Sequence, residues 1–303
     1  MEQLLLEYLP ILIFIGLATV LAIALSPTFP AHAAAGKIAV VAAENFYGGV
    51  AREIGGARVS VVSILNNPDQ DPHLFETTPT VVRHVATAQV VVFNGAGYDS
   101  WMEKLLAVSP KPGRAIIVAA DLMHNKAGGN PHLWYDPRTM PAVAGALAAA
   151  LAAADPVHKD EYAARLKTFL ASLAPLDEKI AAIRSKYAGA PVTATEPVFN
   201  DMAAALNLKM HDARFQIAVM NGTEPGARNF AQFERELKGR EVRVLFYNKQ
   251  APSNLVAHLI DLAHASHVAV VGVTETAPPG DTYLAWMQSE LDATAKALAE
   301  PTS

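Results

Sequence analysis

The chain has 303 residues, of which 51% are hydrophobic and 17% are charged, and its formal net charge is −5. The apolar fraction is sufficient for a packed core and excludes an intrinsically disordered chain, and the acidic balance argues against nucleic acid as a partner. The sequence contains no cysteine, which excludes disulfides, cysteine-ligated metal sites, a cysteine nucleophile and an anchor on a lipid-modified cysteine.

The N-terminal segment differs in composition from the rest of the chain. Residues 8–36 hold no charged side chain, and residues 9–25 are almost entirely apolar. A helix over this apolar stretch would be about 25 Å long, which is short for a membrane span and slightly long for the core of a signal peptide. Because Ala31-His32-Ala33 fits a signal-peptidase site, we expect an export signal over 1–33, with the remaining residues outside the cytoplasm. The region before the apolar stretch, residues 1–8, carries Glu2 and Glu7 and no basic residue, so an uncleaved N-terminal membrane anchor is the alternative.

The remaining sequence alternates short apolar runs with helical patterns, in two groups. Runs rich in β-branched residues, which are typical of strands buried on both faces, occupy 37–43, 59–65, 90–95 and 115–120 in the first group and 191–195, 242–247 and 268–273 in the second. Helical patterns occupy 80–87, 100–108, 200–206, 230–237 and 254–265. Alternating strands and helices predict an α/β fold with parallel-type sheets. We therefore expect two α/β lobes, over 34–154 and 189–303.

One long helical segment, 155–188, links the two groups. Its apolar side chains recur at steps of four and three residues, which places them on one stripe of a helix. The stripe consists of Tyr162, Leu166, Phe169, Leu173, Leu176, Ile180, Ile183 and Tyr187. Pro175 falls inside the segment and should interrupt the helix. We expect this segment to be a rigid spine that bridges the lobes.

Two histidines lie in matching sequence contexts. His73 lies in DPHLFE and His132 in NPHLWYDP, so each follows a proline that is preceded by Asp or Asn. These residues favour a stiff turn, and the apolar neighbours hold the ring, which is the preorganisation that a metal ligand needs. A single block of this kind would more often be a loop histidine satisfied by hydrogen bonds. Two such blocks in one lobe favour metal ligands.

Motifs of catalysis are lacking in this sequence. It contains no GxxxxGK[ST] phosphate loop, no GxSxG elbow and no HExxH helix. Nucleophilic catalysis therefore has no sequence support, and we expect a protein that is not an enzyme.

The two histidine blocks closely resemble the N-terminal-lobe signatures of the metal-binding substrate-binding proteins of bacterial zinc/manganese-type ABC transporters. The resemblance extends over 37–298 and includes AAENFYGGVAREIGG, FNGAGYDSWMEKLL and GDTYLAWMQSELDATAKAL. It implies two α/β lobes bridged by one long helix, with the metal in the cleft between the lobes. It also implies that a monomeric periplasmic protein delivers the metal to a membrane permease, which is driven by a separate ATPase.

The resemblance implies four metal ligands, two from each lobe. His73 and His132 match the first pair, and Glu196, just after the first strand of the second lobe, matches the third. Asp281, which precedes a helix containing a tyrosine, matches the fourth. Taken alone, Glu196 would be a solvated carboxylate at a strand end, and Asp281 a helix N-cap.

The donor set bears on the identity of the metal. Two imidazoles and two carboxylates form a mixed nitrogen and oxygen set, in which the carboxylates can give one or two oxygens each; this suits Mn²⁺, while Zn²⁺ accepts the same ligands. Two departures from the zinc-type pattern also favour manganese: a glutamate at Glu196 where many zinc proteins have histidine, and a short loop, 121–130, in which His124 is the one histidine. We expect one divalent transition metal ion, Mn²⁺ or Zn²⁺. The alternative functions are a metal-dependent hydrolase, or a metal chaperone or adhesin of the same fold.

Overall fold

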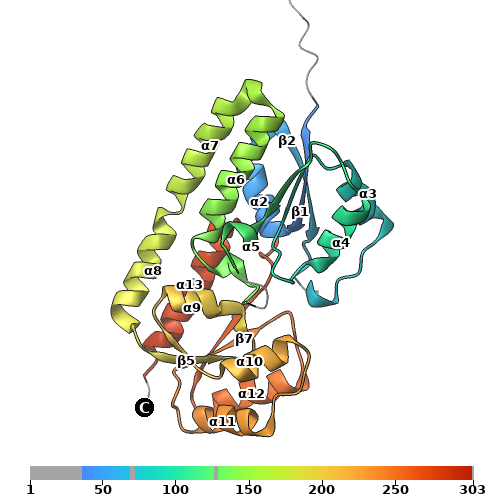
Figure 1. Cartoon of the computed structure of the whole chain (residues 1–303). Coiled ribbons are helices and arrows are strands. Elements are labelled where there is room, and N and C mark those ends of the chain that lie inside the picture. The colour runs from blue at the N-terminus through green and yellow to red at the C-terminus, as the bar shows by residue number, and fades with distance from the viewer. Residues whose placement is uncertain (1–35, 69–71, 126–128, 302–303) are drawn as a thin grey trace, which may run out of the picture. The chain divides into compact units, whose positions relative to one another are not determined.

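The computed structural model describes residues 36–68, 72–125 and 129–301, and the side chain of His73 is also outside the description. The expected export segment, 1–33, therefore lies outside the described residues. Residues 37–303 form one unit by their contacts, shown in Figure 1. In the part of the chain that the structure describes, no helix combines the length and the apolar character that a membrane span requires.

The first lobe is built on a four-stranded parallel sheet with strand order β2-β1-β3-β4 (Figure 1). Its strands are β1 (Ile38–Glu44), β2 (Val59–Leu65), β3 (Val90–Phe93) and β4 (Ala115–Val118). Its helices are α2 (Asn45–Gly55), α3 (Pro79–Thr87), α4 (Ser100–Val108), α5 (Ala119–Leu122) and α6 (Thr139–Ala154). Alternate residues of β1 face opposite sides of the sheet, as strand geometry requires. Val40 packs in the cluster that holds α2 and α6, whereas Val41 packs in the cluster with α3 and α4.

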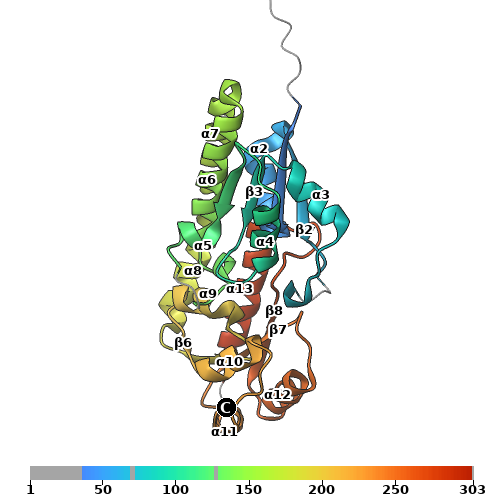
Figure 2. The same cartoon turned by 45° about the vertical axis from the view of Figure 1, so that its right-hand side comes forward.

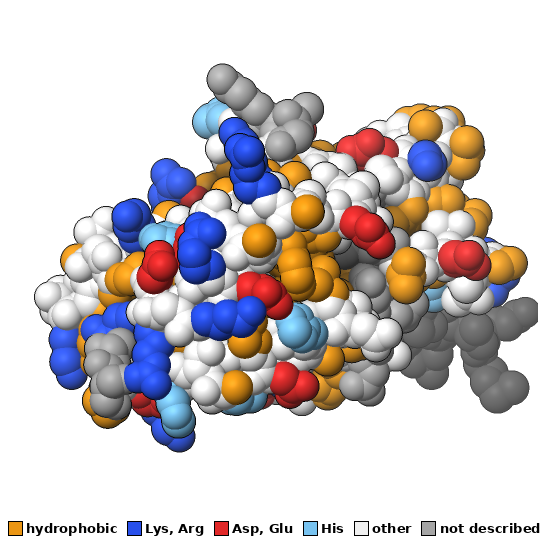
Figure 3. All heavy atoms as spheres, turned by 90° about the horizontal axis from the view of Figure 1, so that it is seen from below, with side chains coloured by type: hydrophobic (Ala, Val, Ile, Leu, Met, Phe, Trp, Pro, Cys, Tyr) orange, Lys and Arg blue, Asp and Glu red, His pale blue; other side chains and the backbone are white. Residues whose placement is uncertain are grey.

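The second lobe repeats this architecture. Its sheet is again four-stranded and parallel, with order β6-β5-β7-β8. The strands are β5 (Pro191–Ala194), β6 (Lys209–Met210), β7 (Val244–Asn248) and β8 (Ala269–Val273), and the helices are α9 (Asn200–Ala205), α10 (Ala213–Met220), α11 (Ala227–Lys238), α12 (Asn254–Ala265) and α13 (Tyr283–Ala299). On its outer side, where Figure 1 places α11 and α12, basic and acidic side chains are interspersed with apolar ones (Figure 3).

The expected spine consists of two helices in sequence, α7 (Lys159–Ser172) and α8 (Ala174–Tyr187). Pro175 lies in the first turn of α8, so the predicted interruption is confirmed and falls at Leu173. The stripe of apolar residues is turned inward along both helices. Helix α7 packs on α6 and α2 of the first lobe, and α8 packs on α13 (Figure 2), so the spine bridges the two lobes.

One cluster of buried hydrophobic residues extends through both lobes. It contains Val40 and Trp134 from the first lobe and Phe246 and Trp286 from the second. Helix α13 contacts β8, α8 and also α2 of the first lobe. Burial at about 25 cal/mol per Å² of apolar surface makes this shared core the main contribution that holds the two lobes together.

The predicted strands and helices correspond to elements of the structure, and the parallel α/β class is confirmed. Sequence reasoning did not predict the helices α2, α5 and α10 or the two-residue strand β6. The short strand pairs with the edge of β5, and a run of two residues carries no periodicity from which it could be predicted.

Candidate metal centre

Three polar side chains of the second lobe lie where its parallel strands end. Glu196 follows β5, Asn248 is the last residue of β7, and Glu275 follows β8. In open α/β sheets the carboxyl ends of the strands, at the point where the strand order reverses, are the usual place of a ligand. The order β6-β5-β7-β8 reverses between β5 and β7, so Glu196 and Asn248 flank that point.

From the first lobe, His132 is the candidate ligand whose side chain the structure describes. It lies directly before the 3-10 helix η3 (Leu133–Tyr135), and it is fully buried. Its Nδ1 is 2.8 Å from Oδ1 of Asn130, and the His132 backbone N–H donates to the same oxygen. Because an amide oxygen can only accept, Nδ1 carries the ring proton and the lone pair of the neutral imidazole is on Nε2.

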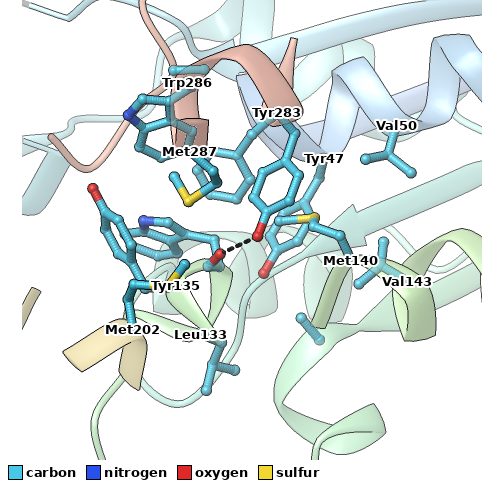
Figure 4. Close-up of a cluster of buried hydrophobic side chains, with 14 of the residues drawn as sticks. Tyr47, Val50, Leu133, Tyr135, Met140, Val143, Met202, Tyr283, Trp286 and Met287 are labelled. Atoms are coloured by element: carbon cyan, nitrogen blue, oxygen red, sulfur yellow. Dashed lines mark hydrogen bonds between the residues drawn. The ribbon is translucent and has the colours of Figure 1, made fainter. Parts of the chain in front are cut away.

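The core beneath η3 holds this histidine loop in place. Figure 4 shows Tyr135 beside Trp286 and Met287 of α13, and the hydroxyl of Tyr283 donates to the carbonyl of Trp134 at 2.9 Å. The indole ring of Trp134 also lies edge-on to His132, with centroids 5.3 Å apart. The ring is therefore held on a rigid support, as a metal ligand requires.

The two lobes meet at His132 and Glu275. Nε2 of His132 lies 3.5 Å from Oε2 of Glu275, and both side chains have no exposed surface. Tyr98 of the first lobe donates to the same Oε2 at 2.8 Å. The pair is thus a buried imidazole and a buried carboxylate, contributed by different lobes.

Asn248 connects the two carboxylates of the second lobe. Its Nδ2 donates to Oε1 of Glu275 at 2.5 Å and to Oε2 of Glu196 at 3.4 Å. Glu196 is 4% exposed. The structure therefore brings Glu196, Glu275 and His132 into one polar cluster.

Two of the four ligands expected from the sequence are in this cluster, and two are not placed there. His132 and Glu196 belong to it. The backbone of His73 lies in the 3-10 helix Pro72–Leu74, but its side chain is outside the described part. Asp281 is exposed, and the carboxylate that faces His132 belongs instead to Glu275.

The alternative interpretation of Asp281, as a helix N-cap, is wrong. The N-cap of α13 is Thr282, whose side chain accepts from the backbone N–H of Ala285. Over residues 36–68, 72–125 and 129–301, with the side chain of His73 left out, no three His, Asp or Glu side chains are grouped tightly enough to hold a metal. The cluster is connected by, among other contacts, the direct one between His132 and Glu275 and the one through Asn248.

Two cavities adjoin the cluster. One, of about 520 Å³, is lined by Tyr98 and Asn130 from the first lobe and by Asn200 and Ile217 from the second. The other, also of about 520 Å³, has Glu196 in its wall and lies within the second lobe. The cluster thus lies beside a cleft between the lobes, which is the place that the family resemblance implies for the metal.

A buried acidic pair lies at the matching point of the first sheet. Glu44 ends β1 and is fully buried, and burial together with the charge of Asp99 raises its pKa well above the usual value. Burial also raises the pKa of Asp99, to about 6. Asp99 accepts from the backbone N–H groups of Asn94 and Gly95. The side chain of Asn94 in turn donates to the carbonyl of Pro131, at 2.7 Å, so this polar network supports the loop that carries His132.

Glu275 is a member of this cluster that sequence reasoning did not identify. Its signal was the same one that identified Glu196, a carboxylate just after a buried apolar run, here VAVVGVTE. Asp281 lies six positions further on, beyond Pro278, Pro279 and Gly280, and that intervening turn leaves it exposed.

Comparison with known proteins gives the family. The family described as zinc-uptake complex component A, periplasmic, matches residues 40–297. The iron ABC transporter substrate-binding lipoprotein MtsA of Streptococcus pyogenes serotype M1 is 24% identical over 306 residues, which cover 94% of this chain and 96% of that protein. The manganese ABC transporter substrate-binding lipoprotein PsaA of Streptococcus anginosus is 23% identical over 286 residues, or 87% of this chain and 90% of that one.

Solved structures show the same fold. The periplasmic zinc-binding protein TroA of Treponema pallidum superposes with a TM-score of 0.74 at 18% identity, covering 88% of this chain and 100% of that one. FpvC of Pseudomonas aeruginosa, solved in complex with Mn²⁺, gives a TM-score of 0.71 at 21% identity, covering 86% and 98%. Since the family match spans most of the sequence, this chain belongs to the family of the periplasmic component A of zinc-uptake complexes.

Proposed function

We propose that this protein captures one divalent transition metal ion between its lobes and delivers it to an ABC-type membrane permease. The observation that carries the proposal is the contact between His132 and Glu275. Nδ1 of His132 donates to Asn130, so in the neutral form of the ring the lone pair is on Nε2, which lies 3.5 Å from a buried carboxylate oxygen. Two electron-rich atoms that face each other in a buried site favour a cation between them.

The separation of the two donor atoms fits a shared ion. With metal–ligand bonds of about 2.1 Å, atoms 3.5 Å apart subtend an angle of about 113° at the ion. That angle is near the tetrahedral value. Two carboxylates also neutralise the charge of a divalent ion, which keeps the buried site free of net charge.

We assign His73, His132, Glu196 and Glu275 as the ligands, with Glu275 in the place expected of Asp281. The donor set remains two imidazoles and two carboxylates, so the chemical argument for Mn²⁺ or Zn²⁺ is unchanged. The relatives support a metal and not one particular metal, because their names refer to iron, manganese and zinc.

Matched variants test the ligand assignment. Glu275→Gln and Asp281→Asn each neutralise one carboxylate with little change in volume. In calorimetric titrations with Mn²⁺ and with Zn²⁺, we expect Glu275→Gln to weaken binding at least tenfold and Asp281→Asn to leave it unchanged. The reverse order would restore Asp281 as the ligand. Glu196→Ala should also weaken binding at least tenfold, and an unchanged affinity would remove Glu196 from the set.

The proposed role in transport rests on the family and on the lack of an ATP-binding motif in this sequence. The sequence contains no phosphate-binding loop, so the proposed partners are a permease and a separate ATPase. The curated relatives are named lipoproteins, whereas this chain has no cysteine to carry a lipid; we propose a periplasmic protein whose N-terminal segment directs export or anchors it.

Elemental analysis of protein purified from its native compartment would identify the metal. Cells that lack the protein should accumulate less of that same metal when it is scarce. Equal uptake with and without the protein would contradict the transport role and leave metal binding itself intact.

A further inference from the structure

We propose that Tyr98 is a positioning residue that restricts Glu275 to coordination through one oxygen, and so sets the coordination number and the metal preference of the site. The inference rests on the proposed metal-binding function. It concerns a residue outside the ligand set and an interaction between the lobes.

The carboxylate of Glu275 is held from both lobes. Its Oε2 accepts the hydroxyl proton of Tyr98, at 2.8 Å, and its Oε1 accepts from Nδ2 of Asn248, at 2.5 Å. Glu275 and Asn248 are almost completely buried, and Tyr98 is 8% exposed. Each oxygen therefore has one lone-pair direction committed to a neutral protein donor.

The donor from the second lobe is fixed in its orientation. Oδ1 of Asn248 accepts the backbone N–H of Gln250 at 3.0 Å. The amide therefore has to present Nδ2 to the carboxylates, because an amide oxygen there would meet another acceptor.

The donor from the first lobe is also held in place. Tyr98 lies in a tight loop closed by Asp99, which accepts the backbone N–H groups of Asn94 and Gly95 at 2.6 and 2.8 Å. The ring of Tyr98 packs edge-on against Trp134 and His132, with centroids 4.9 and 6.0 Å apart. Its hydroxyl therefore reaches Glu275 from a rigid loop.

This arrangement decides how the carboxylate can bind an ion. An ion beside His132 meets Oε2 first, because that oxygen is the one 3.5 Å from Nε2. To bind through both oxygens, the carboxylate has to rotate so that Oε1 also faces the ion, and the rotation breaks the bonds from Tyr98 and Asn248. Coordination through Oε2 alone keeps both bonds. The geometry therefore favours an ion with few ligands over one that requires five or six.

The test is the variant Tyr98→Phe, which removes one hydroxyl and keeps the ring. Its control is Tyr162→Phe, because Tyr162 is also buried and also donates to a carboxylate, Asp155 at 2.9 Å, but it lies on α7. The measurements are Zn²⁺ and Mn²⁺ affinities and the visible spectrum of the Co²⁺-loaded protein, since four-coordinate Co²⁺ absorbs far more strongly than six-coordinate Co²⁺.

We expect Tyr98→Phe still to bind one ion, with a Zn²⁺-to-Mn²⁺ affinity ratio at least fivefold lower and weaker Co²⁺ bands, and Tyr162→Phe to match the wild type in both. An unchanged affinity ratio and an unchanged Co²⁺ spectrum in Tyr98→Phe would overturn the proposal. A six-coordinate Co²⁺ spectrum of the wild-type protein would also overturn it, and this measurement does not depend on whether the variant folds. Failure of wild-type protein to bind any of the three ions would instead overturn the proposed function.

Discussion

Glu290 provides a prediction that depends on the interface between the lobes and not on the metal. This side chain of α13 is fully buried, and burial raises its pKa from the ordinary 4.5 to about 7. Its Oε2 is 2.5 Å from the hydroxyl of Tyr135, which also lies 2.7 Å from the carbonyl of Thr274. The tyrosine has one proton for two acceptors. Both contacts are hydrogen bonds only if Glu290 is protonated and donates to Tyr135, while Tyr135 donates to Thr274.

A raised pKa in the folded state makes the protein lose stability as pH rises. The contribution of Glu290 is fully present below its unfolded pKa, near 4.5, and is lost as pH increases through the folded value of about 7. The interval of about 2.5 units corresponds to roughly 3 kcal/mol, at 1.36 kcal/mol per unit. Glu290→Gln cannot ionise, and its amide can accept from Trp286 as Oε1 does at 2.9 Å while donating to Tyr135.

The assay is urea unfolding of wild type and Glu290→Gln at a series of pH values between 4.5 and 8, with a chelator present to keep metal out of the comparison. We expect the two proteins to have similar free energies of unfolding near pH 5, and the variant to be more stable by about 2 to 3 kcal/mol at pH 8. The difference between the two curves cancels other titrating groups such as Asp99. Parallel curves over the whole range would refute the protonated state of Glu290.

Three further predictions concern the site and its support. Asn130→Ala should lower metal affinity by about 10- to 100-fold in titration calorimetry while keeping one ion per chain, because it removes the acceptor that orients His132; an affinity within twofold of wild type would contradict that role. Gly95→Ala should lower the free energy of unfolding by about 2–4 kcal/mol in chemical denaturation, since φ is +75° and a Cβ would lie 2.6 Å from Val118, and an equal midpoint would show that the loop relaxes. Metal at 100 times the Kd of the wild-type protein should stabilise that protein by about 2.7 kcal/mol in thermal unfolding. At the same metal concentration, most of this stabilisation should be absent in Glu275→Gln, and an equal metal-induced shift in the variant and the wild type would place the ion elsewhere.

The fold could be predicted to a large extent because its determinants are local. Strands such as Val90–Phe93 are buried on both faces, so they leave a continuous apolar run in the sequence. The spine leaves a stripe at helical spacing, and its interruption follows from the ring of Pro175. The two-residue strand Lys209–Met210 leaves neither signal, because pairing with β5 determines it.

The candidate site could be predicted only in part, because its geometry is not local. His132 was identified from a stiff loop that is visible within eight residues of sequence. The carboxylate that meets it comes from the end of β8, in the other lobe. No spacing rule relates two positions that meet only because each lobe places its strand ends at the interface.

Glu275 and Asp281 illustrate why the position of a carboxylate in the fold matters more than its position in the sequence. Both are carboxylates that precede α13, and the resemblance alone favoured the one adjoining the tyrosine. The location of ligand sites at the carboxyl ends of parallel strands favours Glu275 instead. Glu275 lies two positions after the end of β8 and is still held by the sheet, whereas Asp281 follows Pro278, Pro279 and Gly280 and is held by a surface turn. A buried carboxylate needs donors on both oxygens, and Glu275 has them from both lobes. The proposed ligand Glu275 follows from its distance to the end of a buried strand, whereas Asp281 was expected from its distance to the following helix.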